Sequence, residues 1–145
     1  MLIETKYHGE INIDENEIIK FENGIPGFIT EKKFTLLPLD KESPFSILQS
    51  IETTELGFIV VNPFHYTKDY EFDLTDGEKE ALQLTSAEDL EVLAIMTVKE
   101  SLKDSTANLQ APLIINHKKK IGKQIILNNP NYEIRYPLFA ELGEK

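Results

Sequence analysis

Cysteine is absent from the 145-residue sequence. Its absence excludes disulfide bonds, thiolate metal sites and cysteine nucleophiles, and it gives no sign of an oxidising compartment. Long apolar runs are absent too, since no stretch approaches the roughly 18 residues that a membrane span needs. Residues 1–10 also lack the basic and apolar regions of a secretion signal. We therefore expect a cytoplasmic protein that makes no contact with membranes.

Motifs that carry chemistry are also missing. The sequence contains no G-x-S-x-G, Walker or G-x-G-x-x-G pattern. The stretch GIPGF at residues 24–28 lacks the Lys-Ser/Thr pair of a phosphate-binding loop, so we interpret it as a turn. His8, His65 and His117 lie far apart, and no two of them have H-x-x-x-H spacing. We expect neither a cofactor nor a metal ion.

Basic residues are scarce in the middle of the chain. The net charge is −10, and residues 40–91 hold the whole imbalance, with 13 acidic residues against Lys41, Lys68 and Lys79. This charge disfavours direct binding to nucleic acid or anionic lipid, because both attract clustered Lys and Arg. Composition alone favours a solubilising acidic face, but a localised negative field can also steer a basic protein partner.

Short runs of alternating apolar and polar residues follow one another, with turn signals between them. At residues 70–74 the acidic residues Asp69, Glu71 and Asp73 share one face and alternate with apolar residues, as in a half-buried strand. We predict a single domain over residues 1–145 that is mainly β, with antiparallel strands in a closed or nearly closed barrel. The predicted strands lie at residues 3–7, 11–13, 18–21, 34–39, 45–50, 56–61, 70–74, 91–99, 113–116, 123–127 and 132–136.

Helix signals are few, and we expect one or two short helices. Thr75 and Glu78 have the spacing of a capping box, and residues 86–89 could start a second turn of helix. In the loop at residues 22–28 two glycines can take positive φ and a proline removes a donor. We assign Gly24, Pro26 and Gly27 to the geometry of this loop.

Two alternatives to a binding protein remain open. Carboxylate pairs such as Glu52 and Glu55 could converge in a small hydrolase or isomerase, which needs one carboxyl group with a strongly raised pKa in a closed pocket. A barrel that binds RNA directly needs a basic and aromatic face, but the dense basic cluster at residues 117–120 has no interleaved aromatic side chains. We interpret that cluster as a solvated hairpin tip and rank direct RNA binding last.

Six motifs follow one another along almost the whole chain. They are FENGIPGF (21–28), LLPL (36–39), PFSILQSIE (44–52), FIVVNPF (58–64), TANLQAPLIIN (106–116) and QIILNNPNYEIRYPL (124–138). Because the motifs are independent and occur in order, the chain is identified by resemblance as a member of the FliW family of flagellar assembly factors.

The resemblance implies a cytoplasmic β-barrel-like protein that binds newly made flagellin and also binds CsrA, a small dimeric RNA-binding translational repressor. In this scheme flagellin holds the family member until flagellin is exported. The free protein then captures CsrA and weakens its RNA binding allosterically, so that flagellin synthesis resumes. The family has no catalytic residues to carry over, and we expect no enzymatic activity.

The motifs also supply candidates for contact with these partners. Polar or exposed-turn members of the motifs are Gln49, Glu52, Asn62, Phe64, Asn108 and Asn116. Charge alone adds Glu55, Asp69, Glu71 and Asp73. A flagellin helix would need an apolar groove, and C-terminal residues could form its walls, although core packing is expected for most of them: Tyr132, Ile134, Tyr136, Leu138 and Phe139.

Overall fold

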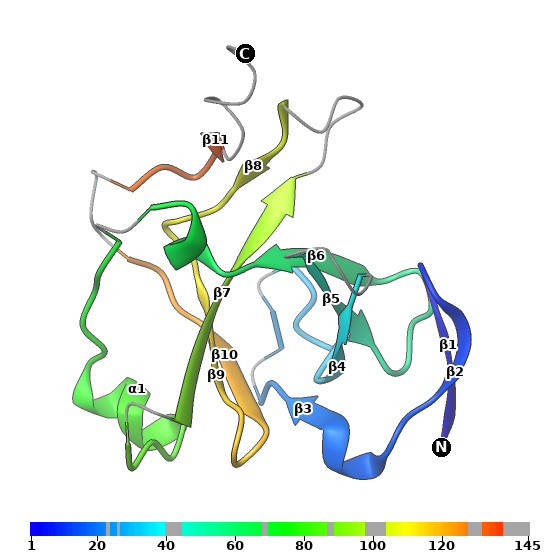
Figure 1. The fold of residues 1–145 in the computed structure, drawn as a ribbon. Coiled ribbons are helices and arrows are strands. Elements are labelled where there is room, and N and C mark those ends of the chain that lie inside the picture. Colours follow the sequence, from blue (N-terminus) through cyan, green and yellow to red (C-terminus); the bar gives the residue numbers. More distant parts are fainter. Residues whose placement is uncertain are drawn as a thin grey trace.

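Seven strands of the computed structural model form one closed barrel in the order β7-β6-β5-β4-β3-β10-β9, and β9 pairs back onto β7 (Figure 1). The structure describes residues 1–22, 24–25, 27–39, 45–67, 70–86, 89–97, 104–127 and 132–137. The barrel strands are β3 Ile18–Lys20, β4 Lys33–Pro38, β5 Ser46–Ser50, β6 Gly57–Val61, β7 Leu90–Thr97, β9 Leu113–Asn116 and β10 Ile121–Gln124. The predicted closed barrel is confirmed.

Strand β7 closes the barrel because its two halves have different partners. Its first half pairs with β9, from Leu90 opposite Asn116 to Leu93 opposite Leu113. Its second half pairs with β6, where Ala94 lies opposite Val61, and with the short strand β8, Thr106–Ala107. β8 in turn pairs with β11, Tyr136–Pro137, at the top of the view in Figure 1.

One pair in the barrel is parallel, β10 with β3, and joins Ile121 to Lys20. The other described barrel pairs are antiparallel, as predicted. The exception follows from the strand count. Around a closed ring an odd number of strands cannot alternate in direction throughout, so at least one neighbouring pair must be parallel.

A separate hairpin, β1 Leu2–Thr5 and β2 Gly9–Asn12, confirms the predicted opening hairpin (Figure 1). The Thr5 hydroxyl donates to the Gly9 carbonyl at 2.8 Å, and Gly9 takes a φ of +67° in the turn. The hairpin is joined to the barrel by Gln49, whose Oε1 accepts from the Lys6 amide at 3.0 Å.

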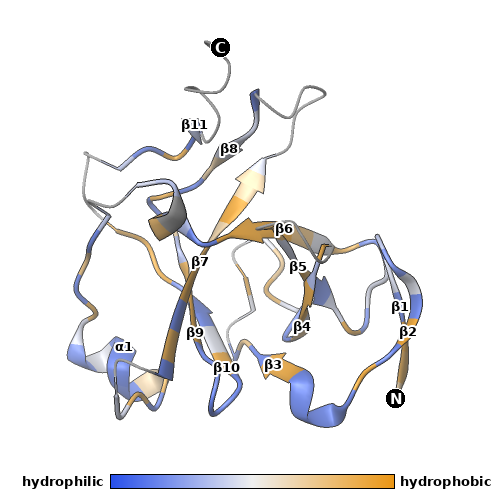
Figure 2. Ribbon diagram, in the orientation of Figure 1, coloured by the Kyte–Doolittle hydropathy of each residue, from blue (hydrophilic) through white to orange (hydrophobic). Residues whose placement is uncertain are grey.

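Apolar side chains form two clusters, one on each side of the barrel wall. The inner cluster takes residues from six strands and includes Phe21, Phe34 and Leu48. The outer cluster packs Tyr70 and Leu82 onto the outside of β7 and β9. All four residues of β9 are buried, because the strand faces both clusters. Figure 2 shows apolar residues on β3 and β6 and polar residues at the β9–β10 turn.

The chain between β6 and β7 contains the short helices. Asn62 accepts from the Phe64 amide at 2.9 Å and begins the 3-10 helix η2, Pro63–His65. A further 3-10 turn, η1 at Glu15–Glu17, lies outside this region, between β2 and β3. Helix α1, Asp76–Ala81, begins at Thr75 with both bonds of the predicted capping box. Among the described residues no helix is long and apolar enough to cross a bilayer. The second predicted helix start, at residues 86–89, lies partly outside the described residues.

Three strand predictions are wrong in part. Of the predicted strand at residues 123–127, only Lys123 and Gln124 belong to β10. Residues 70–74 have the predicted alternation of buried and exposed side chains, but no described strand pairs with them. Of the predicted strand at residues 132–136 only Tyr136 belongs to β11. In residues 70–74 alternation predicted the faces correctly, but in residues 132–136 it did not, because Ile134 is 59% exposed. Alternation also says nothing about whether a neighbouring strand is within hydrogen-bonding reach.

Candidate functional site

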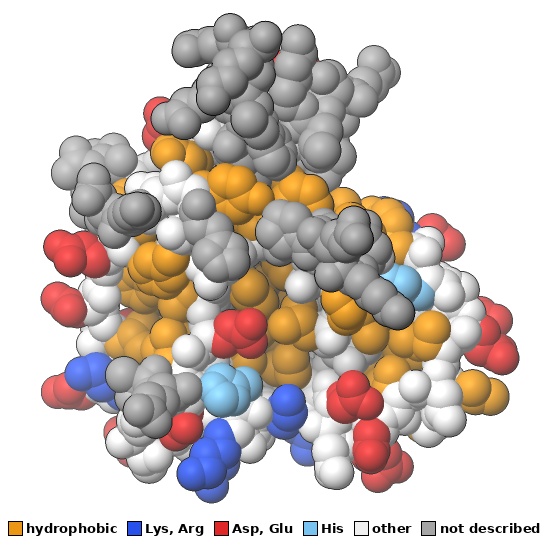
Figure 3. Space-filling view, viewed as in Figure 1, with side chains coloured by type: hydrophobic (Ala, Val, Ile, Leu, Met, Phe, Trp, Pro, Cys, Tyr) orange, Lys and Arg blue, Asp and Glu red, His pale blue; other side chains and the backbone are white. Residues whose placement is uncertain are grey.

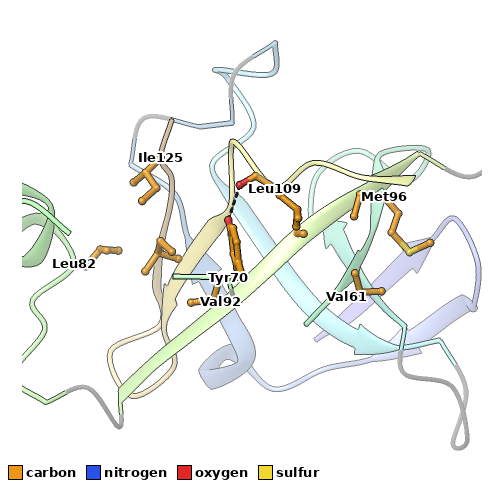
Figure 4. Close-up of a cluster of buried hydrophobic side chains, with 10 residues drawn as sticks. Val61, Tyr70, Leu82, Val92, Met96, Leu109 and Ile125 are labelled. Atoms are coloured by element: carbon orange, nitrogen blue, oxygen red, sulfur yellow. Dashed lines mark hydrogen bonds between the residues drawn. The ribbon is translucent and has the colours of Figure 1, made fainter. Parts of the chain in front are cut away.

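Tyr70 anchors the extended segment that leads into α1. Its ring is buried in the outer cluster, and its hydroxyl donates to the Leu109 carbonyl at 2.6 Å (Figure 4). Burial, and to a smaller extent Tyr132, raises the pKa of Tyr70 far above its ordinary value. The hydroxyl therefore stays protonated and keeps its bond to the core.

Tyr132 fixes the next residue of this segment. Its hydroxyl donates to the Glu71 carbonyl at 2.6 Å and accepts from the Glu71 amide at 2.9 Å. The Tyr132 ring also packs edge-on against Tyr70, with 4.8 Å between centroids. Since the backbone of Glu71 is held by one hydroxyl and its side chain is exposed, the carboxylate is presented outward from a fixed position.

A groove of about 280 Å³ lies beside this segment. One wall carries the carboxylates of Glu71, Asp73 and Glu78, and the other is formed by residues 125–127, of which Ile126 is 62% exposed. Phe72, Thr75 and Tyr132 complete the lining, and neither Lys nor Arg is among its described residues. We call it the acidic groove. Figure 3 shows carboxylates at the left edge of the molecule, over the segment leading into α1 and beside an apolar area.

Phe64 lies next to the same aromatic group. Its ring is 5.6 Å from that of Tyr70 and is 41% exposed, because the 3-10 helix after Asn62 turns it outward. Of the residues predicted to contact partners, Glu71 and Asp73 line the acidic groove, whereas Phe64 packs on Tyr70 outside the described lining. Asn62 is half-buried and caps the helix, so it positions Phe64.

Gln49 and Asn116 do not reach the surface, and we correct their assignment as contact residues. Both are 0% exposed. Gln49 accepts from the Lys6 amide and donates to the Thr54 carbonyl at 3.0 Å, which ties the hairpin and the β5–β6 turn to the barrel. A motif shows only that these amides are polar, and burial with satisfied bonds gives them a role in the fold.

Three further candidates have other positions. Asn108 is half-buried and accepts from the amides of Gln110 and Ala111 at 3.0 and 3.1 Å, so it shapes its own turn. Glu52 and Glu55 are exposed on the turn between β5 and β6, outside the lining of the acidic groove. Asp69 lies outside the described residues. Contact of these residues with a partner stays a prediction.

The described residues do not supply the carboxylate chemistry of the hydrolase alternative. Among the described carboxyl groups, the one with a clearly displaced pKa is that of Glu31, whose pKa is lowered by hydrogen bonds from Ser50 and Thr53. A carboxyl group that acts as a general acid needs a raised pKa. Within the described ranges no three His, Asp or Glu side chains are grouped so as to hold a metal ion.

Two features of the site were not predicted from the sequence. The hydroxyl of Tyr132 meets Glu71 across 61 residues of chain, and residues 125–127 form a groove wall instead of a strand. The resemblance pointed to Tyr132 as a possible groove-wall residue, but not to its bonds with Glu71. Nothing in the sequence pattern distinguished residues 125–127 from an ordinary strand.

Comparison with known proteins gives a consistent result. A family model described as FliW protein matches residues 2–138. Two relatives named flagellar assembly factor FliW are 52% identical (Geobacillus sp. strain WCH70) and 48% identical (Bacillus subtilis strain 168). They cover 97% of this chain and 97% and 99% of their own lengths. A solved structure titled crystal structure of the flagellar assembly factor FliW superimposes with a TM-score of 0.90 at 50% identity, covering 96% of this chain and 97% of the other.

Proposed function

The chain belongs to the FliW family of flagellar assembly factors, and from this premise we propose that it acts in the cytoplasm by binding flagellin and, when free of flagellin, CsrA. Binding to CsrA would lower its affinity for RNA and so relieve repression of flagellin synthesis. The observation that carries the proposal is the match to named flagellar assembly factors over nearly the full length of the chain and of the relatives. In this proposal the protein catalyses no reaction.

The acidic groove supports the CsrA part of the proposal. An RNA-binding repressor needs a basic surface, and the described lining of the groove offers three carboxylates and no base. Such a field speeds encounter with a basic protein at low salt and places negative charge where phosphate would otherwise approach. Charges of exposed groups are screened over a Debye length of about 8 Å at physiological ionic strength, so the effect should weaken with salt.

The apolar part of the groove supplies contact area that charge alone does not. Ile126 is mostly exposed, and Phe72 and Leu127 are half-buried beside it. Burying apolar area contributes roughly 25 cal/mol per Å², whereas exposed ion pairs contribute about 0–1 kcal/mol each. We therefore assign affinity to the apolar wall and partner choice to the carboxylates.

Fluorescence anisotropy of a labelled flagellin-leader RNA bound to CsrA tests this function. Addition of the protein should release the RNA, and addition of flagellin should restore the complex. For the variant Glu71→Lys/Asp73→Lys, about tenfold more protein should be needed for the same release of RNA, because two favourable charge contacts become unfavourable.

The matched control is Glu4→Lys/Glu10→Lys, which reverses two exposed charges that lie opposite each other on the β1–β2 hairpin. Both variants have the same net charge, so a difference in RNA release between them shows that the position of the reversed charges matters. If neither the wild type nor the control releases RNA, the proposed function is wrong. If the two variants behave alike, the groove is not the surface involved.

A further inference from the structure

Phe28 and Ile29 expose apolar surface outside the described lining of the acidic groove. Phe28 is 42% exposed and Ile29 is 68% exposed. The two residues are neighbours in the chain, and Phe28 packs edge-on against Phe58 with 5.5 Å between centroids. None of the three belongs to the lining of the acidic groove. Adjacent exposed apolar side chains on a fixed support are typical of a contact surface.

The described residues on either side of Phe28 and Ile29 are tightly constrained. The Phe28 amide donates to the Ile25 carbonyl at 2.6 Å, and the Glu31 amide donates to the Phe28 carbonyl at 3.0 Å. Gly24 takes a φ of +66°, and a Cβ there would lie 2.5 Å from the Ile29 carbonyl oxygen. Because backbone packs on backbone, Ile29 is held in place with its side chain outward. Binding of a partner to Ile29 therefore costs little conformational entropy in this protein.

A depression of about 490 Å³ adjoins Phe28 and Ile29 and is completed by the turn between β5 and β6. That turn contributes Leu56, which is half-buried, and the carboxylate of Glu55. Glu31 contributes a second carboxylate. We call this surface the Phe28 patch. No base is among its described lining residues, although Lys32 and Lys33 follow Glu31 along the chain and Ile29 also borders a second cavity that Lys123 lines.

The charge of Glu31 is fixed in place by the β5–β6 turn. The Ser50 hydroxyl donates to Glu31 Oε1 at 2.7 Å and accepts from the amides of Glu52 and Thr53 at 3.2 and 3.0 Å. These contacts attach the carboxylate to the same turn that presents Glu55. The Phe28 patch therefore combines an apolar centre with fixed negative charge at its rim.

We propose that the Phe28 patch docks a segment of another protein that carries a bulky apolar side chain next to lysine or arginine. The apolar side chain would enter the depression beside Phe28 and Ile29, and the base would lie at Glu31 or Glu55. An anionic lipid surface would meet two carboxylates and be repelled. A second copy of this chain, placed by twofold symmetry, would bring the same carboxylates together, and the chain's net charge of −10 adds to that repulsion.

The test uses methyl-labelled protein and a synthetic probe. The probe is a short capped peptide with Leu and Phe at its centre and Lys on both flanks, and the control peptide has Glu in place of Lys. In carbon-detected spectra the Ile29 methyl signals should shift saturably with the Lys peptide, with a Kd below about 1 mM. The Glu peptide should bind at least about tenfold more weakly. In Ile29→Ser, where the methyl signals of Leu56 in the same lining report binding, the affinity for the Lys peptide should fall at least about tenfold.

Leu2→Ser is the matched control, since Leu2 is 67% exposed on β1 and lies outside the described lining of the patch. Both substituted side chains are exposed, so neither variant is expected to unfold. The titration is repeated in Glu71→Lys/Asp73→Lys, where persistence of the Ile29 shift separates this surface from the acidic groove and from the proposed function. Equal binding by Ile29→Ser and Leu2→Ser, or no shift at Ile29, would overturn the proposal.

Discussion

Replacing Asn116 with alanine should lower the free energy of unfolding by about 2–3 kcal/mol, because its buried amide joins three parts of the chain. Nδ2 donates to the carbonyls of Leu82 and Gln83 at 2.8 and 3.2 Å, just after α1. Oδ1 accepts from the amides of Lys118 and Lys119 at 3.1 Å each, in the β9–β10 turn. The substitution removes all four bonds.

The four bonds do not contribute equally. Lys118 and Lys119 are exposed, so water can replace the acceptor that their amides lose. Leu82 is fully buried, and its carbonyl would lose the Asn116 donor where water does not reach, at a cost of about 1–3 kcal/mol. Gln83 has a φ of +53°, so weakening its bond also removes support for an unfavourable backbone conformation.

Urea unfolding followed by far-UV circular dichroism measures the effect by linear extrapolation. The control is Asn12→Ala, whose exposed Oδ1 accepts from the terminal amine at 2.9 Å and which should change stability by less than about 0.5 kcal/mol. A loss of less than about 0.5 kcal/mol in Asn116→Ala would refute the structural assignment. If that variant kept its stability and lost partner binding instead, the original assignment of Asn116 as a contact residue would be restored.

Three further predictions concern the loop, the core and pH. Gly24→Ala should cost at least about 1 kcal/mol more in urea unfolding than Gly27→Ala, since both have positive φ but only Gly24 lacks space for a Cβ; equal losses would contradict this. Tyr70→Phe should cost about 1–2 kcal/mol at neutral pH from its lost core hydrogen bond. Because the pKa of Tyr70 is raised on folding, the associated stability is present below pH about 10 and is lost as pH rises through the folded value, so the cost should shrink there. Because the pKa of Glu31 is lowered on folding, its stability is present above about pH 4.5 and is lost as pH falls through the folded value; Ser50→Ala should flatten this part of the acid unfolding curve.

Local signals in the sequence predicted local structure well. The capping box at Thr75, the opening hairpin and the positive φ of Gly24 and Gly27 all depend on residues a few positions apart. The closed barrel was also predicted, from the number of short strands and the scarcity of helix. The parallel pair was not, because it depends on the strand count around the ring.

The sequence predicted which acidic residues of the candidate site are exposed, but it did not predict which distant residues complete the groove. The charge pattern correctly predicted that Glu71 and Asp73 are exposed, but their groove needs residues 125–127, which are distant in the chain. The polar motif members Gln49 and Asn116 were misassigned, since a sequence does not distinguish a buried, bonded amide from an exposed one. The exposure of Ile29 could not be predicted either, because apolar character alone predicts a buried side chain.

Calorimetric titration of the protein with purified CsrA and, separately, with soluble flagellin tests the central claim most directly. Each titration is run at two temperatures, so that a binding enthalpy near zero at one of them is not mistaken for lack of binding, and the CsrA titration is repeated at raised salt and with Glu71→Lys/Asp73→Lys. The account predicts saturable binding to both partners, with the affinity for CsrA reduced by salt and by charge reversal. Absence of heat with either partner at both temperatures would contradict it.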